Sequence, residues 1–255
     1  MMNLFARPGA FAVTLAASRH LLRIAMSATP HPLDNVVWNA LAGAHAPLAE
    51  GGALARRYRP EIARFLALAE PTAAARAALA ALVPAGEEGA LVGAPDLDPG
   101  DAFEILGRVE LVQMVCAGLV GEPRDAARFR PLVDADVPRM IALVEQTKPG
   151  PFQRRTIDFG GFLGHEVDGR LAAMGGYRMR LDDFAEVSGI CTDPEFRGRG
   201  LARDLVLILS RRIVAAGGTP FLHAFGDNRT AIALYEKLGF VVRARPTVTR
   251  VKRRG

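Results

Sequence analysis

The sequence predicts an α/β fold in which a mixed central sheet is flanked by helices and preceded by a smaller α/β half. Three observations carry this prediction. Residues 186–216 read as a strand, a glycine-rich corner and a helix without a gap. Asp168-Gly169 separates two apolar runs, which is a strong hairpin signal. A Pro/Gly-containing stretch, 121–125, separates two regions that each mix helical and strand patterns.

Composition limits the class of protein. The chain has 255 residues, half of them hydrophobic, which is enough for one large or two small domains. Its two cysteines, Cys116 and Cys191, form neither a disulfide framework nor a metal-binding pattern. We therefore expect no metal and a reducing, cytoplasmic location. The domains predicted are a first half over 31–120 and a second half over 126–255.

The net charge of +5 is partly concentrated near the C-terminus. One interpretation is a solvated face and a frayed tail, and the other is attraction of an anionic cofactor. Nucleic acid is not expected as a partner, because no nucleic-acid-binding motif accompanies the charge. No apolar run reaches the 18 residues of a membrane span, so no membrane partner is expected either. The basic residues in question are Arg243, Arg245, Arg250, Lys252, Arg253 and Arg254.

Residues 1–30 are expected to lie outside the fold, as a disordered extension or as the product of a mis-called start. Up to Ala25 this segment contains no acidic residue, and its short apolar run fits no targeting class well. Met26 is the alternative start that we prefer, and a targeting segment is the second interpretation.

The first half shows mixed helix and strand signals. Asp34 or Asn35 is positioned to cap a short helix, and Thr72 to cap an Ala-rich helix that ends before Pro84. Residues 53–68 are ambiguous. Strands are expected over 89–93 and as one or two strands over 103–117. We find no glycine corner and no catalytic cluster in this half.

The second half has clearer elements. Asp134 or Asp136 would cap a helix that runs to Val144, and a Pro/Gly/Arg loop follows over 147–157. The helix of the glycine corner has Leu201, Leu205, Ile208, Leu209 and Ile213 on one face. Strands are expected over 129–133, 162–166, 171–179, 186–192, 220–225, 240–244 and 248–252, the last two closing the sheet.

The glycine corner Arg197-Gly-Arg-Gly200 predicts an anion site, because the first N–H groups of a helix lack intrahelical partners and glycine lets a phosphate approach. Three phosphate-binding motifs compete for it. Leu201-Ala202 stands where a Walker loop needs Lys-Ser/Thr, and Arg203 stands where a dinucleotide fingerprint needs its third glycine. The third motif, Arg/Gln-x-x-Gly-x-Gly/Ala, is matched by Arg197, Gly200 and Ala202.

A second motif follows at Asn228–Phe240, which reads NRTAIALYEKLGF. Together, the two segments resemble the GNAT superfamily of acyl-CoA-dependent N-acyltransferases over roughly 128–245. The layout of two halves further resembles the tandem members of the glycine N-acyltransferase type, in which the first half is a degenerate copy of the second. The resemblance implies acetyl-CoA, or another short acyl-CoA, as co-substrate.

The resemblance also implies a set of cofactor-binding residues. The loop would hold the CoA pyrophosphate, and Asn228 would hydrogen-bond the pantetheine arm, as an alternative or in addition to capping its helix. The strand before the loop would pair its free backbone groups with pantetheine. The residues concerned are Ile190, Cys191, Thr192, Arg197, Gly198, Arg199, Gly200, Leu201, Ala202 and Asn228.

Two residues are the catalytic candidates. Tyr235 matches the position of the general acid in this family, where a phenol protonates the departing thiolate; a packed helix tyrosine is the alternative. Glu186 lies where several members keep a general base, which matters because an alkyl amine is almost wholly protonated at neutral pH. The alternative is that Glu186 is a surface glutamate at a strand end, in which case water or His223 would be the base. Cys191 suits a small core residue better than an acyl carrier.

We therefore expect an N-acyltransferase that moves an acetyl or short acyl group to a primary amine of a small molecule, amino acid or peptide. The amine would attack directly in a ternary complex. The alternative is a non-catalytic module that senses CoA or a nucleotide. The acceptor and the oligomeric state, monomer or homodimer, stay open at this point.

Overall fold

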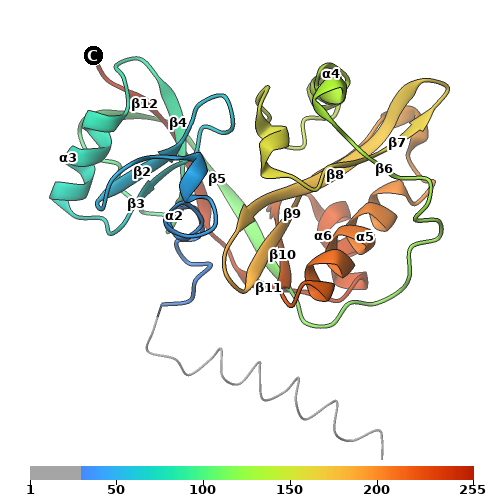
Figure 1. Cartoon of the computed structure of the whole chain (residues 1–255). Coiled ribbons are helices and arrows are strands. Elements are labelled where there is room, and N and C mark those ends of the chain that lie inside the picture. The colour runs from blue at the N-terminus through green and yellow to red at the C-terminus, as the bar shows by residue number, and fades with distance from the viewer. Residues whose placement is uncertain (1–29) are drawn as a thin grey trace, which may run out of the picture.

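The computed structural model describes residues 30–255 (Figure 1). The predictions for residues 1–29, including the alternative start at Met26, lie outside the described residues. None of the helices in 30–255 is both long enough and apolar enough to cross a membrane.

A nine-stranded mixed sheet organises the molecule. Its strand order is β4-β12-β5-β10-β9-β8-β7-β6, with β11 also pairing with β5. Among the pairings within this sheet, only β9 with β10 is parallel. The strands are β4 (Glu88–Gly93), β5 (Phe103–Cys116), β6 (Arg130–Pro131), β7 (Leu163–Val167), β8 (Arg170–Arg180), β9 (Phe184–Thr192), β10 (Thr219–Phe225), β11 (Phe240–Ala244) and β12 (Thr247–Arg253).

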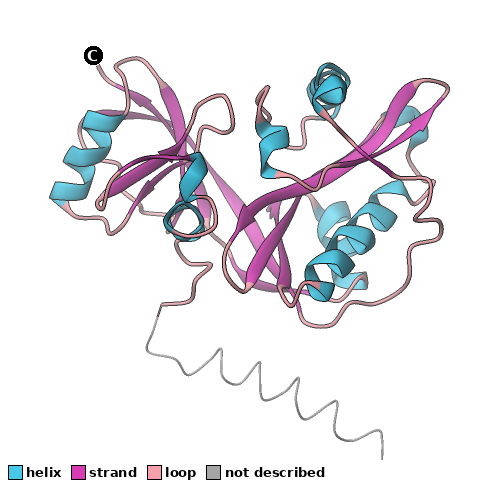
Figure 2. Ribbon diagram, viewed as in Figure 1, coloured by secondary structure: helices cyan, strands magenta, loops and turns pink. Residues whose placement is uncertain are grey.

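Helices cover both faces of the second half's sheet. Figure 2 shows α4 on one face and α5 and α6 on the other. Leu205 and Leu209 of α5 are fully buried, as the apolar periodicity predicted. The helices are α4 (Val137–Thr147), α5 (Leu201–Ala215) and α6 (Arg229–Lys237), with 3₁₀ turns at Asp134–Asp136, Thr156–Phe159 and Pro194–Phe196.

The first half adds a three-stranded antiparallel sheet and two helices. The Thr72 side chain accepts a hydrogen bond from the Ala75 N–H, which confirms the predicted cap. Asn35 stands at the start of its helix, but its side chain donates to Leu68 O instead of capping. The elements are α2 (Val36–Ala42), a 3₁₀ turn (Ala46–Leu48), β1 (Ala49–Gly51), β2 (Ala55–Tyr58), β3 (Leu66–Leu68) and α3 (Ala73–Leu82).

The predicted hairpin between β7 and β8 is confirmed. Val167 lies opposite Arg170, and the two intervening residues have positive φ angles, 50° at Asp168 and 76° at Gly169. This is the geometry of a two-residue type I′ turn, whose twist matches that of the strands.

The place of the C-terminal strand corrects the sequence prediction. Residues 248–252 were expected to close the sheet of the second half, but β12 pairs with β4 and β5 of the first half. The reason is the length of β5, which pairs through 103–110 with β12 and through 111–115 with β10. The two halves therefore share one sheet across the predicted boundary at 121–125.

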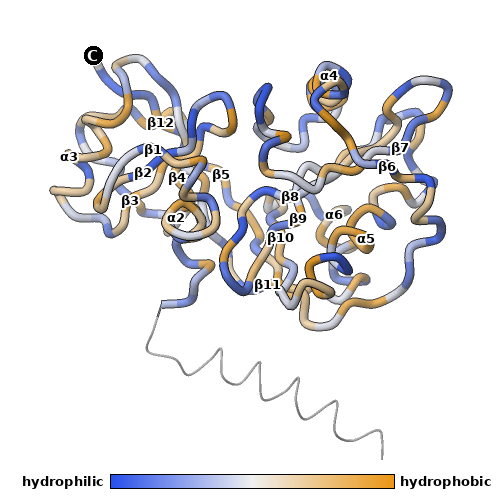
Figure 3. Tube along the Cα trace, viewed as in Figure 1, coloured by the Kyte–Doolittle hydropathy of each residue, from blue (hydrophilic) through white to orange (hydrophobic). Residues whose placement is uncertain are grey.

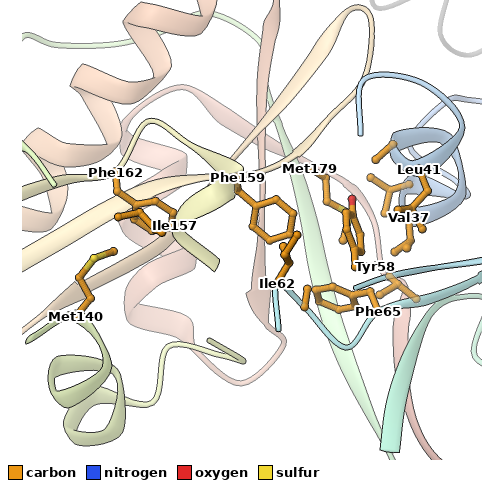
Figure 4. Close-up of a cluster of buried hydrophobic side chains, with 14 of the residues drawn as sticks. Val37, Leu41, Tyr58, Ile62, Phe65, Met140, Ile157, Phe159, Phe162 and Met179 are labelled. Carbon is orange, nitrogen blue, oxygen red and sulfur yellow. The ribbon is translucent and has the colours of Figure 1, made fainter. Parts of the chain in front are cut away.

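Buried side chains from both halves meet in one cluster (Figure 4). Tyr58 and Phe65 of the first half lie near Phe159 and Met179 of the second. The Tyr58 hydroxyl is 2.9 Å from Nδ1 of the buried His45, whose ring stacks on Phe159 at 5.4 Å between centroids. Apolar stretches also follow the central strands in Figure 3. The halves are thus fixed to each other by packing as well as by strand pairing.

Candidate functional site

The parallel pair β9–β10 separates partway along its length. Residues 184–186 pair with 219–221, and no pairing between the two strands follows beyond that point. Residues 187–192 of β9 and 223–225 of β10 instead line a cleft of about 920 Å³. This confirms the expectation that the central strand parts from its neighbour and leaves backbone groups without a strand partner on that side.

A bulge in β9 further exposes its backbone to the cleft. Between the pairs Gly176–Ser188 and Met174–Cys191, two residues of β9 face one residue of β8. Beyond the bulge, the Thr192 hydroxyl oxygen is buried and has no hydrogen-bond partner within 30–255. Thr192 lines the cleft, as do Ile190 and Cys191. An extended polar chain such as pantetheine would supply the partners that these groups lack.

The glycine loop closes the same cleft at the start of α5. Gly200 is the N-cap residue and has φ 78°, a left-handed conformation that favours glycine, and no side chain caps the helix. The unpaired N–H groups of the first turn and the helix dipole fit a pyrophosphate. Most of the loop lines the cleft: Arg197, Gly198, Gly200, Leu201 and Ala202.

Two arginines change the predicted residue set. Arg199 does not line the cleft, and its guanidinium lies 5.0 Å from the centroid of the Phe196 ring. Arg203 does line it, although in the sequence Arg203 is marked only by its departure from a dinucleotide motif. Arg203 follows Arg199 by four residues, which places it in the first turn of α5, and this spacing could have identified it.

Asn228 and Tyr235 bring the second motif to the cleft. Asn228 Oδ1 accepts a hydrogen bond from the Ala231 N–H at 3.1 Å and caps α6, so its amide NH₂ stays available. Tyr235 is 9% exposed, and burial raises its pKa to about 12. With this pKa the phenol is protonated at neutral pH. No residue within 30–255 hydrogen-bonds the hydroxyl, so it is available to a group in the cleft.

Glu186 lies behind the wall of the cleft. It is fully buried, and its carboxylate accepts hydrogen bonds from Arg178, at 2.9 Å from Nε, and from His223, at 2.7 Å from Nδ1. Burial alone would raise the pKa of Glu186, but Arg178 and then His223 outweigh it and lower the pKa to about 2. Arg178 and His223 line the cleft, and Glu186 does not. The predicted base therefore reaches the cleft only through these two neighbours.

Gln113 of β5 determines which nitrogen of His223 carries the proton. Its Oε1 accepts from Arg243 Nη1 at 2.6 Å, and its amide donates to Leu33 O at 3.1 Å. The same amide nitrogen lies 3.1 Å from His223 Nε2, which must therefore accept. His223 Nδ1 then bears the hydrogen donated to Glu186. Sequence analysis missed Gln113, because nothing in β5 marks one polar residue as a partner of β10.

Cys191 is 5% exposed, and burial raises the pKa of its thiol to about 12. The thiolate needed by an acyl carrier is therefore disfavoured. Its backbone stands beside the bulge, and its side chain belongs to the buried cluster between the halves.

The first half, together with the strand β12 that pairs with it, supplies the opposite wall of the cleft, which was not predicted from the sequence. The contributing segments carry no motif, and they approach the site only because β5 and β12 connect the halves. The residues from these segments are Val36, Arg64, Phe65, Glu88, Gly89, Ala90, Val92, Val109, Leu111, Val248 and Arg250.

Comparison with known proteins agrees with this geometry. The family described as FR47-like protein matches residues 163–249. A ribosomal protein bS18-alanine N-acetyltransferase of Salmonella typhimurium is 32% identical over 117 residues, 43% of this chain and 77% of that enzyme. A Novosphingobium aromaticivorans structure assigned to the GNAT family of acetyltransferases has a TM-score of 0.81 and 38% identity, covering 89% of this chain and all of that one.

The chain belongs to the GNAT family. A mycothiol acetyltransferase of Nocardiopsis dassonvillei is also similar, at 37% identity over 93 residues. That match covers 32% of this chain but only 28% of the longer relative. This chain has a mixed central sheet flanked by helices, which matches the fold of its GNAT neighbour.

Proposed function

We propose that this GNAT protein transfers an acetyl group, or another short acyl group, from acyl-CoA to a primary amine. The observation that carries the proposal is the single cleft that contains the glycine loop, the bulged strand β9, Tyr235 and His223. The names of the bS18-alanine and mycothiol relatives support acetyl transfer, and they concern different acceptors. The acceptor is therefore argued from this chain's own cleft.

The residues of the loop and of β9 would hold acetyl-CoA, which supplies the activated acyl group as a thioester. The first turn of α5 and Arg203 would bind the pyrophosphate. Thr192, the β9 backbone and the Asn228 amide would hydrogen-bond the pantetheine arm. This assignment keeps the predicted residues, apart from Arg199, in contact with the cofactor.

Tyr235 would act as the general acid. Its pKa of about 12 keeps the phenol protonated at neutral pH. A phenol this weak donates its proton only as negative charge develops on the departing sulfur, so its contribution belongs to the transition state.

The amine would give its proton to His223, whose other ring nitrogen is hydrogen-bonded to Glu186. Glu186 is a poor direct base, because it is buried, ion-paired and has a pKa near 2. His223 has Nε2 as the acceptor atom, and Glu186 would stabilise the charged imidazole after transfer, as a carboxylate does in related hydrogen-bonded pairs. The amine N–H would replace the Gln113 amide at Nε2. Glu186 is in this account a positioning residue.

The route would be direct attack in a ternary complex. A buried Cys191 thiol with a pKa of about 12 is not suited to carry the acyl group. The two substrates would instead occupy the cleft together, the cofactor against α5 and the amine against the first half. From the layout of the two halves, we further infer a tandem origin of the glycine N-acyltransferase type. We also infer a cytoplasmic location, since Cys116 and Cys191 are both unpaired.

Thiol release from acetyl-CoA, measured with a panel of primary amines, tests the proposed function. We expect acceptor-dependent release and an N-acetylated product identified by mass spectrometry. A chain that binds CoA but releases no thiol with any amine would instead be the sensing module. Substitution of His223 by Gln should lower kcat, because the amine then has no basic side chain to take its proton; an unchanged kcat would assign the proton to water.

A further inference from the structure

The charge of the cleft is strongly asymmetric. Among the described residues, one carboxylate lines it, that of Glu88. The lining cations are Arg64, Lys148, Arg178, Arg197, Arg203 and Arg250. Because the proposed cofactor is an anion, some of these cations would bind it, and the others would face the acceptor.

Three of the six cations have other partners. Arg197 and Arg203 belong to the glycine loop and the first turn of α5. The charge of Arg178 is balanced by the buried Glu186 carboxylate. Arg64, Lys148 and Arg250 remain. Within residues 30–255, the one carboxylate in ion-pair distance of any of them is that of Glu88, which lies 3.7 Å from Arg250. Arg64 has no ion pair or side-chain hydrogen bond with any residue in 30–255.

Arg64 lies at the acceptor end of the cleft. Its neighbour Phe65 packs under Arg178, whose guanidinium carbon is 5.5 Å from the centroid of the ring. Arg178 and Glu186 stand where β9 and β10 are still paired, and the glycine loop follows the other end of β9. Arg64 is therefore on the His223 side of the cleft, beside β4 of the first half.

The wall between His223 and these cations is apolar. It includes Val92 of β4, Leu111 of β5 and Val248 of β12, the strand that lies between those two in the sheet. A ligand matching this surface has an amine at one end, an aliphatic or aromatic body, and a negative group at the other end. A guanidinium binds a carboxylate through two parallel hydrogen bonds.

We propose that the acceptor is an amine that also carries a carboxylate, and that Arg64 binds this carboxylate. The proposal rests on the proposed acyl transfer and narrows its substrate class. Arg250 and Lys148 add positive potential, which disfavours diamines and other acceptors with a cationic tail.

The test compares acceptors that differ only in their tail. One set is 5-aminopentanoate, pentylamine and cadaverine; the other is leucine, leucinamide and 3-methylbutylamine, which places the carboxylate beside the amine. We expect the carboxylate member of at least one set to exceed its neutral counterpart in kcat/KM by about tenfold or more. Cadaverine should be the poorest acceptor of its set.

The substitution Arg64→Gln should remove this preference, by lowering kcat/KM for the carboxylate acceptor about tenfold without changing that for the neutral amine. Arg254→Gln is the matched control, because Arg254 is an exposed arginine just after β12 that does not line the cleft. Equal rates for carboxylate and neutral members in both sets, or an equal loss for all acceptors in Arg64→Gln, would overturn the proposal.

Calorimetry separates this inference from the proposed function. If no amine is acetylated, the proposed function fails, but the carboxylate site is still testable. Binding of 5-aminopentanoate or leucine to the CoA-saturated chain, weakened at least tenfold in Arg64→Gln and unchanged in Arg254→Gln, would support it. Absence of binding by the wild type, or equal binding by Arg64→Gln, would contradict it.

Discussion

The two walls of the cleft are built on different principles. The wall from the second half uses backbone geometry: the bulge in β9, the left-handed Gly200 and the open first turn of α5. The wall from the first half uses side chains on ordinary strands, such as Val92 and Leu111. Backbone geometry of this kind requires particular residues at fixed spacing, whereas an apolar wall accepts many. The cofactor side therefore has a sequence motif, and the acceptor side has none.

A substitution of Tyr235 tests whether the chemistry belongs to the second half alone. Tyr235→Phe removes the proton donor and should lower kcat about 10- to 10³-fold with little change in KM for acyl-CoA. Tyr177→Phe is the control, since the Tyr177 hydroxyl donates to Leu209 O outside the cleft. Steady-state kinetics would refute the role if both variants kept the wild-type kcat.

Glu186 tests the buried network that joins the two walls. Glu186→Gln leaves the buried Arg178 without its counter-ion and His223 without a charged partner. We expect a kcat about 10²-fold lower and an unfolding free energy lower by about 3–5 kcal/mol. Glu166→Gln, which removes a partly exposed partner of Arg130, should have much less effect on both. Kinetics are measured at a temperature where urea titration finds the variant folded. Full kcat in the folded Glu186→Gln variant would exclude the positioning role.

His45 tests the packing of the first half through pH. Burial, and secondarily Arg180, lowers the pKa of His45 from 6.5 to about 4. The folded chain then binds fewer protons than the unfolded chain below pH 6.5. His45 therefore contributes full stability above that pH, and about 3 kcal/mol is lost as pH falls to about 4.

Urea unfolding between pH 7 and pH 4 measures this loss. The unfolding free energy of His45→Gln should depend less on pH in this window than that of the wild type. His165→Gln, which alters a histidine near the opposite end of the sheet, is the matched control. Equal slopes for the wild type and His45→Gln would show that His45 does not couple folding to pH.

Cys191 should have the smallest effect on activity. Cys191→Ala should keep kcat within about twofold and lose some stability through the cavity it leaves in the buried cluster. Cys116→Ala controls for loss of a thiol away from the cleft. Parallel-line kinetics, or an acylated Cys191 detected by mass spectrometry without acceptor, would reverse the assignment of direct attack.

Sequence reasoning succeeded where local geometry dictates residue type. The α5 helix and the turn at Asp168-Gly169 were predicted, because each follows from short-range spacing, whereas the free backbone of β9 was expected only from the family resemblance. The partners of β12 were predicted wrongly, because its alternating buried and exposed side chains are compatible with pairing to any strand at the edge of a sheet. The contacts of His223 with Gln113 and Glu186 could not be predicted, because residues far apart in sequence meet only after the strands are ordered.

The central claim is that the glycine loop binds CoA, and Gly200→Asp tests it most directly. Gly217→Asp is its matched control: Gly217 follows the other end of α5, also has a left-handed φ, 83°, and lies outside the cleft. Calorimetry should find micromolar CoA binding by the wild type and by Gly217→Asp, and at least 100-fold weaker binding by a folded Gly200→Asp variant, which places bulk and negative charge at the pyrophosphate position. Equal CoA affinity in all three proteins, or no CoA binding by the wild type, would contradict the claim.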